Sequence, residues 1–221
     1  MWIDDSPEEH ATVSEQLDSL ELLQGSEATP VYPLDPAVSG LLILPRTTTA
    51  ARELHDQSQR GLLVLSCSVL VRGPVMQDQG RIELNLIQGP GGRMKIDGAG
   101  QRAATAWKVV EHFVGFALVE CRPQPPLPHQ IRPLLEAAGL PLAVDPLYGG
   151  SRELMLSSFK AGYRPSHRHT ERPLIDRVSM HVSSAEFQHP RSRELVRWEC
   201  PPPKDFRAAL HQLNRFGRMP R

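Results

Sequence analysis

A carboxylate on a stiff segment is the first candidate for chemistry in this chain. Asp35 lies in the stretch 31–44, which reads Val-Tyr-Pro-Leu-Asp-Pro-Ala-Val-Ser-Gly-Leu-Leu-Ile-Leu. The flanking prolines hold its backbone extended, and Ser39-Gly40 marks a tight turn or a close backbone approach. The apolar run at 41–44 is expected to enter the centre of a sheet. Asp35 is therefore either a turn-forming residue or a functional carboxylate on a loop beside a buried strand.

Metal and disulfide chemistry have little support in the pattern. The 3 cysteines are widely spaced, odd in number and without a C-x-x-C pair. They argue against a disulfide framework or a zinc site and indicate a reducing cytoplasm. His167, His169 and His181 have no cysteine or carboxylate at ligand spacing, so we expect no metal site.

The charged residues are distributed unevenly along the 221-residue chain. Formal net charge is zero, but nine of the 25 acidic residues and none of the 25 basic ones precede Arg46. Most of the basic residues are arginine, which suits bidentate contact with phosphate. The pattern fits either a basic nucleic-acid-binding body behind an acidic N-terminal piece or an ordinary solvated surface. No apolar run is long enough for a membrane span, and the start lacks a basic, apolar leader.

Four stretches in order resemble the motifs of the RluA-like RNA pseudouridine synthases. The first resembles H-R-L-D-x-x-T-S-G-L-L: its letters L-D and S-G-L-L stand at 34–35 and 39–42. Tyr32, Pro33 and Val38 replace the family's His, Arg and Thr.

The other three stretches follow at the spacing of the family. Cys67 stands where the family has a Tyr, and 129–132 matches the H-Q-I-R of G-R-T-H-Q-I-R, whose first three letters are lost. Residues 139–149 resemble G-H-P-L-V-G-D-P-L-Y-G. The resemblance covers about residues 30–216. The family's N-K-P-x-G strand is absent, so we expect an N-terminally shortened chain with no separate RNA-binding module before it.

The resemblance implies that the chain isomerises a uridine in structured RNA (rRNA or tRNA) to pseudouridine, without cofactor or metal. This reaction breaks the N–C glycosidic bond, turns the base and rejoins it through carbon. It needs a carboxylate as nucleophile or base and a cation that keeps this carboxylate ionised. The catalytic candidates are Asp35, its partner Arg132 and, in the Tyr position, Cys67. The candidate RNA-contacting residues are His129, Gln130, Ser39, Gly40, Arg93, Lys95, Arg164 and Arg168.

The departures from the motifs leave two functions open. Pro33 lacks the charge of the family's Arg, which helps to displace the target base. Cys67 cannot stack on uracil and is either a proton carrier or a small buried hydrophobe. The Asp35–Arg132 pair predicts an active or weakly active synthase, whereas the departures favour a catalytically impaired RNA-binding relative. A hydrolase is poorly supported, because no second catalytic carboxylate or nucleophile–base pair is evident.

The elements that must position these residues alternate between strands and helices. Strands are expected at 62–71, 82–86, 104–113, 116–122, 178–187 and 194–200. Helices are expected at 6–25, 49–60, 151–160, from about 129 to 139, and after Pro203. Pro133 is compatible with the fourth of these helices if Gln130 caps it. We therefore predict a monomeric α+β protein with a mixed, largely antiparallel β-sheet flanked by helices, the pseudouridine synthase catalytic fold. Residues 1–29 are expected to form an acidic helical segment and residues 30–221 a single catalytic domain.

Overall fold

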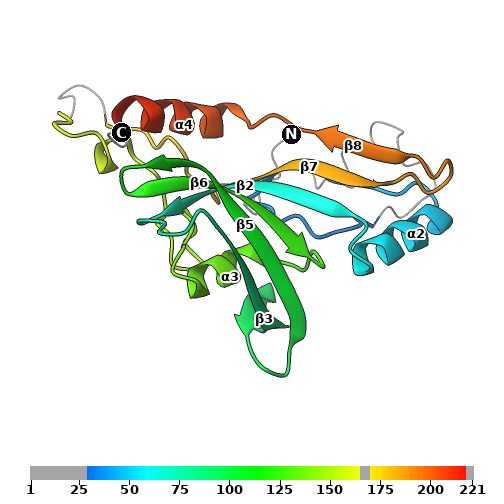
Figure 1. The fold of residues 1–221 in the computed structure, drawn as a ribbon. Helices are drawn as coiled ribbons and strands as arrows, with labels where there is room; N and C mark the ends of the chain where they lie inside the picture. Colours follow the sequence, from blue (N-terminus) through cyan, green and yellow to red (C-terminus); the bar gives the residue numbers. More distant parts are fainter. Residues whose placement is uncertain (1–28, 165–169, 218–221) are drawn as a thin grey trace.

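A twisted sheet forms the centre of the computed structural model, which describes residues 29–164 and 170–217 (Figure 1). The acidic helix expected near the N-terminus lies outside these residues. The strands are β1 (Ser39–Gly40), β2 (Val64–Arg72), β3 (Gln79–Gln88), β4 (Met94–Ile96), β5 (Gln101–Phe113), β6 (Phe116–Gln124), β7 (Met180–Gln188) and β8 (Leu195–Glu199). The helices are α2 (Thr48–Gln59), α3 (Ile131–Ala137) and α4 (Lys204–Phe216), with 3-10 turns η1 (Pro90–Gly92) and η2 (Leu156–Ser158).

The order of the strands confirms the predicted sheet type. Within the described ranges the order is β1-β7-β2-β6-β5-β3-β4, and β8 pairs with β7. The β1–β7 pair is parallel and the other pairs are antiparallel. This is the mixed, largely antiparallel sheet of a single α+β domain.

The two faces of the sheet are covered by different helices. Neighbouring residues of a strand point to opposite faces, and Val69 and Leu70 of β2 are both fully buried. Val69 belongs to the cluster that contains Ile131 of α3, whereas Leu70 packs in the cluster that contains Phe206 of α4. Helices α3 and α4 therefore lie on opposite faces (Figure 1). The face under α3 is the one that carries Cys67.

Two local signals place helices where the sequence predicts them. Thr47 caps α2, because its Oγ1 accepts a hydrogen bond from the Ala50 N–H at 3.1 Å. Gln130 is the N-cap of α3, so Pro133 falls in the first turn, where the helix needs no N–H donor. Arg132 thereby lies in the first turn of a helix that packs on one face of the sheet.

The expected central strand at 41–44 is wrong. Strand β1 contains only Ser39–Gly40 and lies at the edge of β7. From Ser184 onward this same edge is paired with β8, beginning opposite Glu199. The apolar run therefore has no strand edge to join, and it packs instead as irregular chain.

The expected helix at 151–160 is also wrong, apart from the short turn η2. Ser151 forms a bridge with Val144, and Leu154 forms one with Ile175. The Leu154 N–H donates to Ile175 O at 2.8 Å. Because Leu154 is also 1% exposed, tertiary pairing and burial outweigh the local helical pattern here.

Candidate active site

The predicted ion pair between Asp35 and Arg132 is present. Arg132 Nη1 donates to Asp35 Oδ2 at 2.9 Å, across 97 positions of sequence. Asp35 lies on the loop before β1, where its carbonyl accepts the N–H of Val38 at 2.9 Å. The two residues are 7% and 5% exposed. Asp35 thus forms the expected turn and also carries a buried carboxylate.

A second carboxylate, which sequence reasoning missed, fixes the orientation of Arg132. Asp145 is fully buried and accepts from Arg132 Nε and Nη2, both at 2.7 Å. Burial acts to lower the pKa of Arg132, but the hydrogen bonds and charges of Asp145 and Asp35 raise it above its usual value. This bidentate contact leaves Nη1 directed at Asp35. The sequence signal for Asp145 was the aspartate in the stretch 139–149, the fourth motif.

An aromatic residue from the same motif completes the cluster around Arg132. Tyr148 is 2% exposed, and the guanidinium carbons of Arg93 and Arg132 lie over its ring, 5.1 and 4.8 Å from the centroid. Its hydroxyl accepts from the Met94 N–H at 2.8 Å and is 3.1 Å from His129 Nδ1. Tyr148 therefore links His129, which directly precedes α3, to Met94 at the start of β4.

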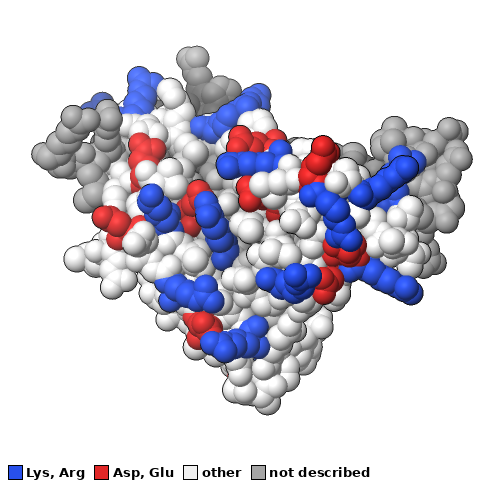
Figure 2. Space-filling model, turned by 45° about the vertical axis from the view of Figure 1, so that its right-hand side comes forward, with Lys and Arg blue, Asp and Glu red and all other residues white. Residues whose placement is uncertain are grey.

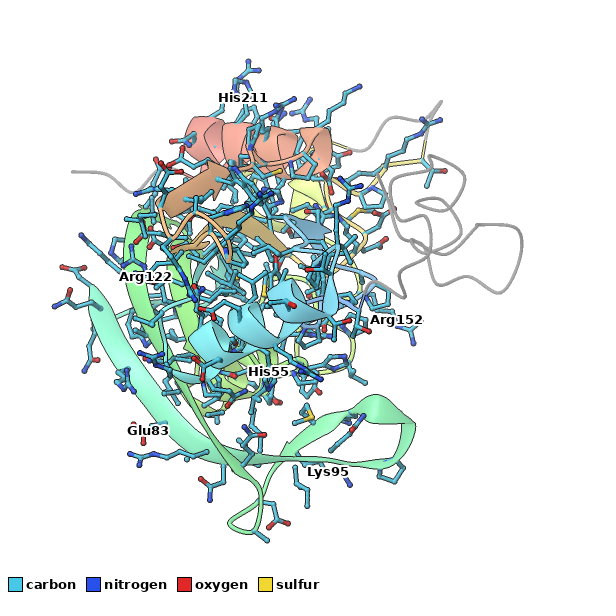
Figure 3. The ribbon with its side chains drawn as sticks, turned by 90° about the vertical axis from the view of Figure 1, so that its right-hand side faces the viewer. His55, Glu83, Lys95, Arg122, Arg152 and His211 are labelled. Carbon is cyan, nitrogen blue, oxygen red and sulfur yellow. The ribbon has the colours of Figure 1, made fainter. Side chains whose placement is uncertain are left out.

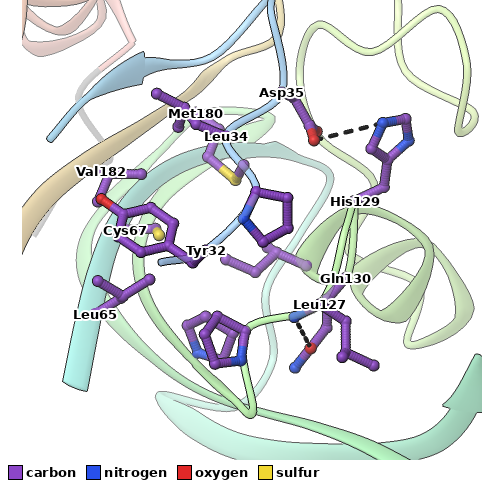
Figure 4. Close-up of a pocket in the computed structure, with 14 residues that line it drawn as sticks. Tyr32, Leu34, Asp35, Leu65, Cys67, Leu127, His129, Gln130, Met180 and Val182 are labelled. Atoms are coloured by element: carbon purple, nitrogen blue, oxygen red, sulfur yellow. Dashed lines mark hydrogen bonds and ion pairs between the residues drawn. The ribbon is translucent and has the colours of Figure 1, made fainter. Parts of the chain in front are cut away.

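His129 lies between Tyr148 and Asp35. Its Nε2 is 3.4 Å from Asp35 Oδ1, a contact drawn in Figure 4 and longer than a normal hydrogen bond. The backbone of His129 has a φ of 50°, a left-handed conformation that histidine tolerates better than most residues. Burial lowers its pKa, Arg132 lowers it further, and Asp35 and Asp145 act in the opposite direction.

The cavity beside Asp35 has a volume of about 40 Å³ and is lined by Cys67, His129, Gln130 and apolar neighbours (Figure 4). For comparison, an apolar cavity of about 150 Å³ binds benzene, and a single water fits in far less. The described conformation therefore has room for a water molecule but is closed to a pyrimidine ring.

Cys67 lines the cavity beside Asp35, and its thiol is unsuited to ionise there. Burial, aided by the charges of Asp35 and Glu120, raises its pKa to about 12. The ring of Tyr32 lies beside Cys67 among Leu65 and Val182 (Figure 4), and the Tyr32 hydroxyl donates to Leu41 O. The space next to the small thiol is thus filled by an aromatic ring from the first motif.

Besides His129 and Arg93, three of the predicted RNA-contacting residues, Gln130, Gly40 and Ser39, have contacts within the protein. The Gln130 side chain bonds to Leu127 N, Ala104 O and Thr105 Oγ1, at 2.9, 2.8 and 3.3 Å. Gly40 must be glycine, since a Cβ there would lie 2.3 Å from Val182 O. Gln130 thus holds the start of α3 in place, and Gly40 lets the loop that carries Asp35 pack against β7.

Ser39 forms a pair with His181 that the sequence did not reveal. Ser39 Oγ lies 2.9 Å from His181 Nδ1, and His181 Nε2 lies 2.9 Å from Cys200 O. Because Nε2 must donate to the carbonyl, Nδ1 accepts the hydroxyl proton. The pair connects β1 to β7 and is absent from the cavity lining.

The predicted basic residues are dispersed. Arg93 lies against Tyr148. Lys95 lies on β4, in the hairpin of β3 and β4 that projects from the rest of the molecule (Figure 3). Arg164 is exposed, and Arg168 lies outside the described residues. On the face shown in Figure 2, acidic groups lie among the basic ones. That face carries no patch of a single charge.

Two absences can be stated for residues 29–164 and 170–217. No group of three or more His, Cys, Asp or Glu side chains there is arranged to hold a metal ion. In the same residues no helix is long and apolar enough to cross a membrane.

Comparison with known proteins identifies the family of this chain. The sequence profile described as RNA pseudouridylate synthase matches residues 5–137, more than half of the chain. The chain belongs to the RNA pseudouridylate synthase family. This membership confirms the RluA-like resemblance seen in the motifs.

Relatives within the RNA pseudouridylate synthase family come from plants and bacteria. The chain is 32% identical over 197 residues to RNA pseudouridine synthase 2, chloroplastic, of Oryza sativa subsp. japonica, covering 83% of this chain and 44% of that protein. It is 31% identical to ribosomal large subunit pseudouridine synthase D of Neisseria meningitidis serogroup B, covering 87% and 50%. Ribosomal large subunit pseudouridine synthase C of Escherichia coli is 29% identical, with 83% and 55% covered. The chain thus spans about half the length of these relatives.

Solved structures confirm the RNA pseudouridylate synthase fold. Human RNA Pseudouridylate Synthase Domain Containing 1 superposes with a TM-score of 0.62 at 20% identity, covering 87% of this chain and 74% of that one. Domain Containing 4 gives a TM-score of 0.65 at 18% identity, covering 92% and 84%. At such identities the likeness concerns the fold alone.

Proposed function

We propose that this chain is an RNA pseudouridine synthase that isomerises a uridine in structured RNA, rRNA or tRNA, with Asp35 as its catalytic carboxylate. One observation supports the proposal above the others. In a chain of this family, a buried aspartate at the family's motif position lines a cavity and is held by an arginine that a second aspartate orients. Two of the relatives are named as enzymes of the ribosomal large subunit, which favours rRNA.

The geometry suits the chemistry that the reaction requires. Asp35 acts as nucleophile at the sugar or as base, and the single bond from Arg132 Nη1 leaves its Oδ1 directed toward His129. Asp145 prevents the guanidinium from turning away. Cys67, with its raised pKa, serves as an apolar wall of the cavity.

Binding of uridine begins with opening of the site. The cavity of about 40 Å³ must grow severalfold to admit the base. Its wall contains Pro33 and Leu127, on loops, and His129, at a left-handed position before α3. Pro33 and Leu127 are free of sheet pairing and are the residues that we propose to move.

A second candidate function rests on the ring of Tyr32. This ring fills the space next to Cys67 and leaves the cavity too small for a base. If the cavity stays closed, the chain is a catalytically impaired RNA-binding relative that keeps the fold and its exposed basic residues. RNA binding is common to both proposals, so product formation distinguishes them.

The deciding experiment is to map pseudouridines in the RNA of the host with and without this gene. A site lost on deletion should return with the wild-type gene and stay absent with Asp35→Asn, because the amide lacks the charge and nucleophilicity of the carboxylate. The purified variant should lose about 10⁴-fold or more in rate and retain its RNA affinity. An unchanged pseudouridine map, with wild-type RNA affinity intact, would favour the binding protein.

The RNA contact can be tested through its salt dependence. Each phosphate contact adds about −0.7 to −0.9 to the slope of log affinity against log salt. Arg164→Ala and Lys95→Ala should each reduce this slope by about one contact. Arg60→Ala is the control, since Arg60 is paired with Asp56 at 3.1 Å at the end of α2. A slope that neither variant changes contradicts these contacts.

We further propose that the chain acts as a monomer in the cytoplasm, without cofactor or metal. The cysteines of the described residues are free thiols, which supports a reducing compartment. Isomerisation needs no redox partner or group donor. Chelator treatment should therefore leave the rate unchanged, and the protein should sediment as a monomer.

A further inference from the structure

The two nitrogens of His129 have different surroundings. Nδ1 is 3.1 Å from the Tyr148 hydroxyl, whereas Nε2 is 3.4 Å from Asp35 Oδ1. The first distance is that of a hydrogen bond and the second is longer than one. The side chain is 20% exposed and lines the cavity. One nitrogen is thus bound to the protein, and the other remains available at the cavity.

Tyr148 decides which nitrogen of His129 carries the proton. The Tyr148 oxygen already accepts the Met94 N–H at 2.8 Å, and its own proton needs an acceptor because the residue is buried. The nearby acceptor is His129 Nδ1. A neutral imidazole that accepts at Nδ1 carries its hydrogen on Nε2. The donor of His129 therefore points at the cavity and at Asp35.

The charged groups around His129 keep it neutral. Burial and the Arg132 guanidinium on α3 lower its pKa, while Asp35 on the loop before β1 and Asp145 after α3 raise it, and the net direction is downward. Tyr148 faces it from the same segment as Asp145, with Arg93 stacked on the Tyr148 ring. Protonation would also place a hydrogen on Nδ1 against the tyrosine's own proton. The neutral Nε2–H form is the one that fits these contacts.

We infer that His129 donates its Nε2–H to the uracil ring as the glycosidic bond breaks, and that Tyr148 is the positioning residue that holds this donor in place. The inference rests on the proposed function. Whether Asp35 acts as nucleophile or base, the N1–C1′ electron pair stays on the uracil ring, which becomes an anion. C5 then bonds to C1′, C5 loses its proton and N1 gains one. His129 contributes a hydrogen bond and is unchanged at the end.

The long contact between His129 and Asp35 suits the movement of charge during the step. Asp35 loses its negative charge as it forms a bond to carbon or takes a proton, while the uracil ring gains that charge. A donor 3.4 Å from Oδ1 is not committed to the aspartate and can serve the ring beside it. A preorganised donor at a developing charge is worth about 10²–10³-fold in kcat.

The first test reads the proton directly and needs no activity. Nitrogen NMR of the imidazole in the full chain should show neutral His129 with its hydrogen on Nε2 at pH 7. Tyr148→Phe keeps the ring under Arg93 and Arg132 but removes the hydroxyl, so the Nε2–H form should lose its preference and the pKa of His129 should rise. Hydrogen on Nδ1 in the wild type, or no change in the variant, overturns the positioning role.

The second test measures the rate. His129→Gly removes the imidazole without straining the left-handed backbone, and we expect kcat to fall about 100-fold with little change in KM. His129→Gln returns an N–H donor and should recover part of this loss. Tyr148→Phe should lower kcat about fivefold and move the acid limb of its pH profile toward neutral pH. His112→Gln, on an exposed β5 histidine that contacts Asp78, is the control.

The outcomes separate this inference from the proposed function. A wild-type protein that makes no pseudouridine on any RNA overturns the catalytic role of His129 together with the proposed function. A protein that is active, loses activity in Asp35→Asn and keeps its full rate in His129→Gly overturns the inference alone. A loss in His129→Gly that His129→Gln partly restores supports it.

Discussion

Two buried arginines of this protein bind aspartates in different ways. Arg177 donates to both carboxylate oxygens of Asp205, at 2.9 and 3.3 Å. Its Nη1 donates to the carbonyls of Val178 and Met180, both at 3.1 Å. Asp205 lies in the first turn of α4, so the pair ties α4 to the start of β7. Arg132, by contrast, binds two aspartates, one of which, Asp35, lines a cavity.

Among the residues that the structure describes, the two guanidinium groups differ in the number of carboxylates that they bind. Asp205 supplies one carboxylate to Arg177, and backbone carbonyls accept further hydrogens. Arg132 has a bidentate bond to Asp145, equivalent to that of Arg177, and a single bond to Asp35 in addition. The bidentate contact of an arginine with one aspartate is sufficient to stabilise a fold. The additional carboxylate, facing a cavity, is what indicates chemistry.

Each arginine also has a histidine nearby, and the two histidines show the same contrast. His181 near Arg177 is bound at both nitrogens, to Ser39 and to the Cys200 carbonyl. His129 near Arg132 is bound at Nδ1 and keeps Nε2 at the cavity. These contacts suit a structural His181 and agree with the role that we propose for His129.

The largest effect is expected from removing the arginines. Arg132→Ala leaves two buried carboxylates without their partner, and we expect about 3–5 kcal/mol less free energy of unfolding and no product. Arg177→Ala leaves Asp205, whose side chain is 18% exposed, and should cost about 2–3 kcal/mol with product formation intact. Urea unfolding and a pseudouridine assay at a temperature where both variants are folded provide the two measurements. Equal losses of activity would contradict the comparison.

The next effect comes from neutralising the aspartates. Asp145→Asn keeps an oxygen for the Leu147 and Tyr148 N–H groups, which it accepts at 3.1 and 3.2 Å. It weakens the bidentate bond, so we expect about 1.5–3 kcal/mol less stability and a clear fall in kcat as Arg132 loses its orientation.

Asp205→Asn is the matched control for Asp145→Asn. It weakens the same kind of bond to Arg177 and should reduce stability, by urea unfolding, without lowering kcat. The interpretation fails if kcat falls in the control or stays at the wild-type value in Asp145→Asn.

A smaller effect is expected from filling the cavity. From the sequence alone, Cys67→Tyr restores a missing ring and should raise the rate if the pocket has room. The structure places the Tyr32 ring there, so the larger side chain should cost about 1–3 kcal/mol by overpacking and give no gain. Tyr32→Ala combined with Cys67→Tyr should recover stability. A Cys67→Tyr single variant that is faster than wild type would show that the pocket does open around a second ring.

The smallest effect concerns pH. Burial lowers the pKa of both His129 and His181 below the ordinary value of 6.5. Below pH 6.5 the unfolded chain takes up a proton at each histidine that the folded chain does not, so the free energy of unfolding should fall as the pH falls. His129→Gln and His181→Gln should each reduce this dependence in urea titrations at pH 5.5 and 7.5. A dependence equal to that of the wild type in both would exclude the histidines as its cause.

Local signals in the sequence were sufficient for much of the fold. The Thr47 cap, the Gly115 hairpin turn with a φ of 75°, and the amphipathic pattern of α4 each act within a few residues. The helix at 151–160 and the strand at 41–44 failed, because their backbone partners lie elsewhere in the chain. In both cases tertiary pairing was stronger than the local pattern.

The sequence by itself determined the family and the identity of the motif residues, and the resemblance predicted the pairing of Asp35 with Arg132, since these depend on residue types in the order of the family's motifs. Only the tertiary structure decided how the site is arranged. It brought Asp145 and Tyr148 to Arg132, placed the Tyr32 ring beside Cys67, and closed the cavity to about 40 Å³. Distances between side chains that are far apart in sequence follow from packing. The direction of a hydrogen bond follows from the groups that burial has brought together.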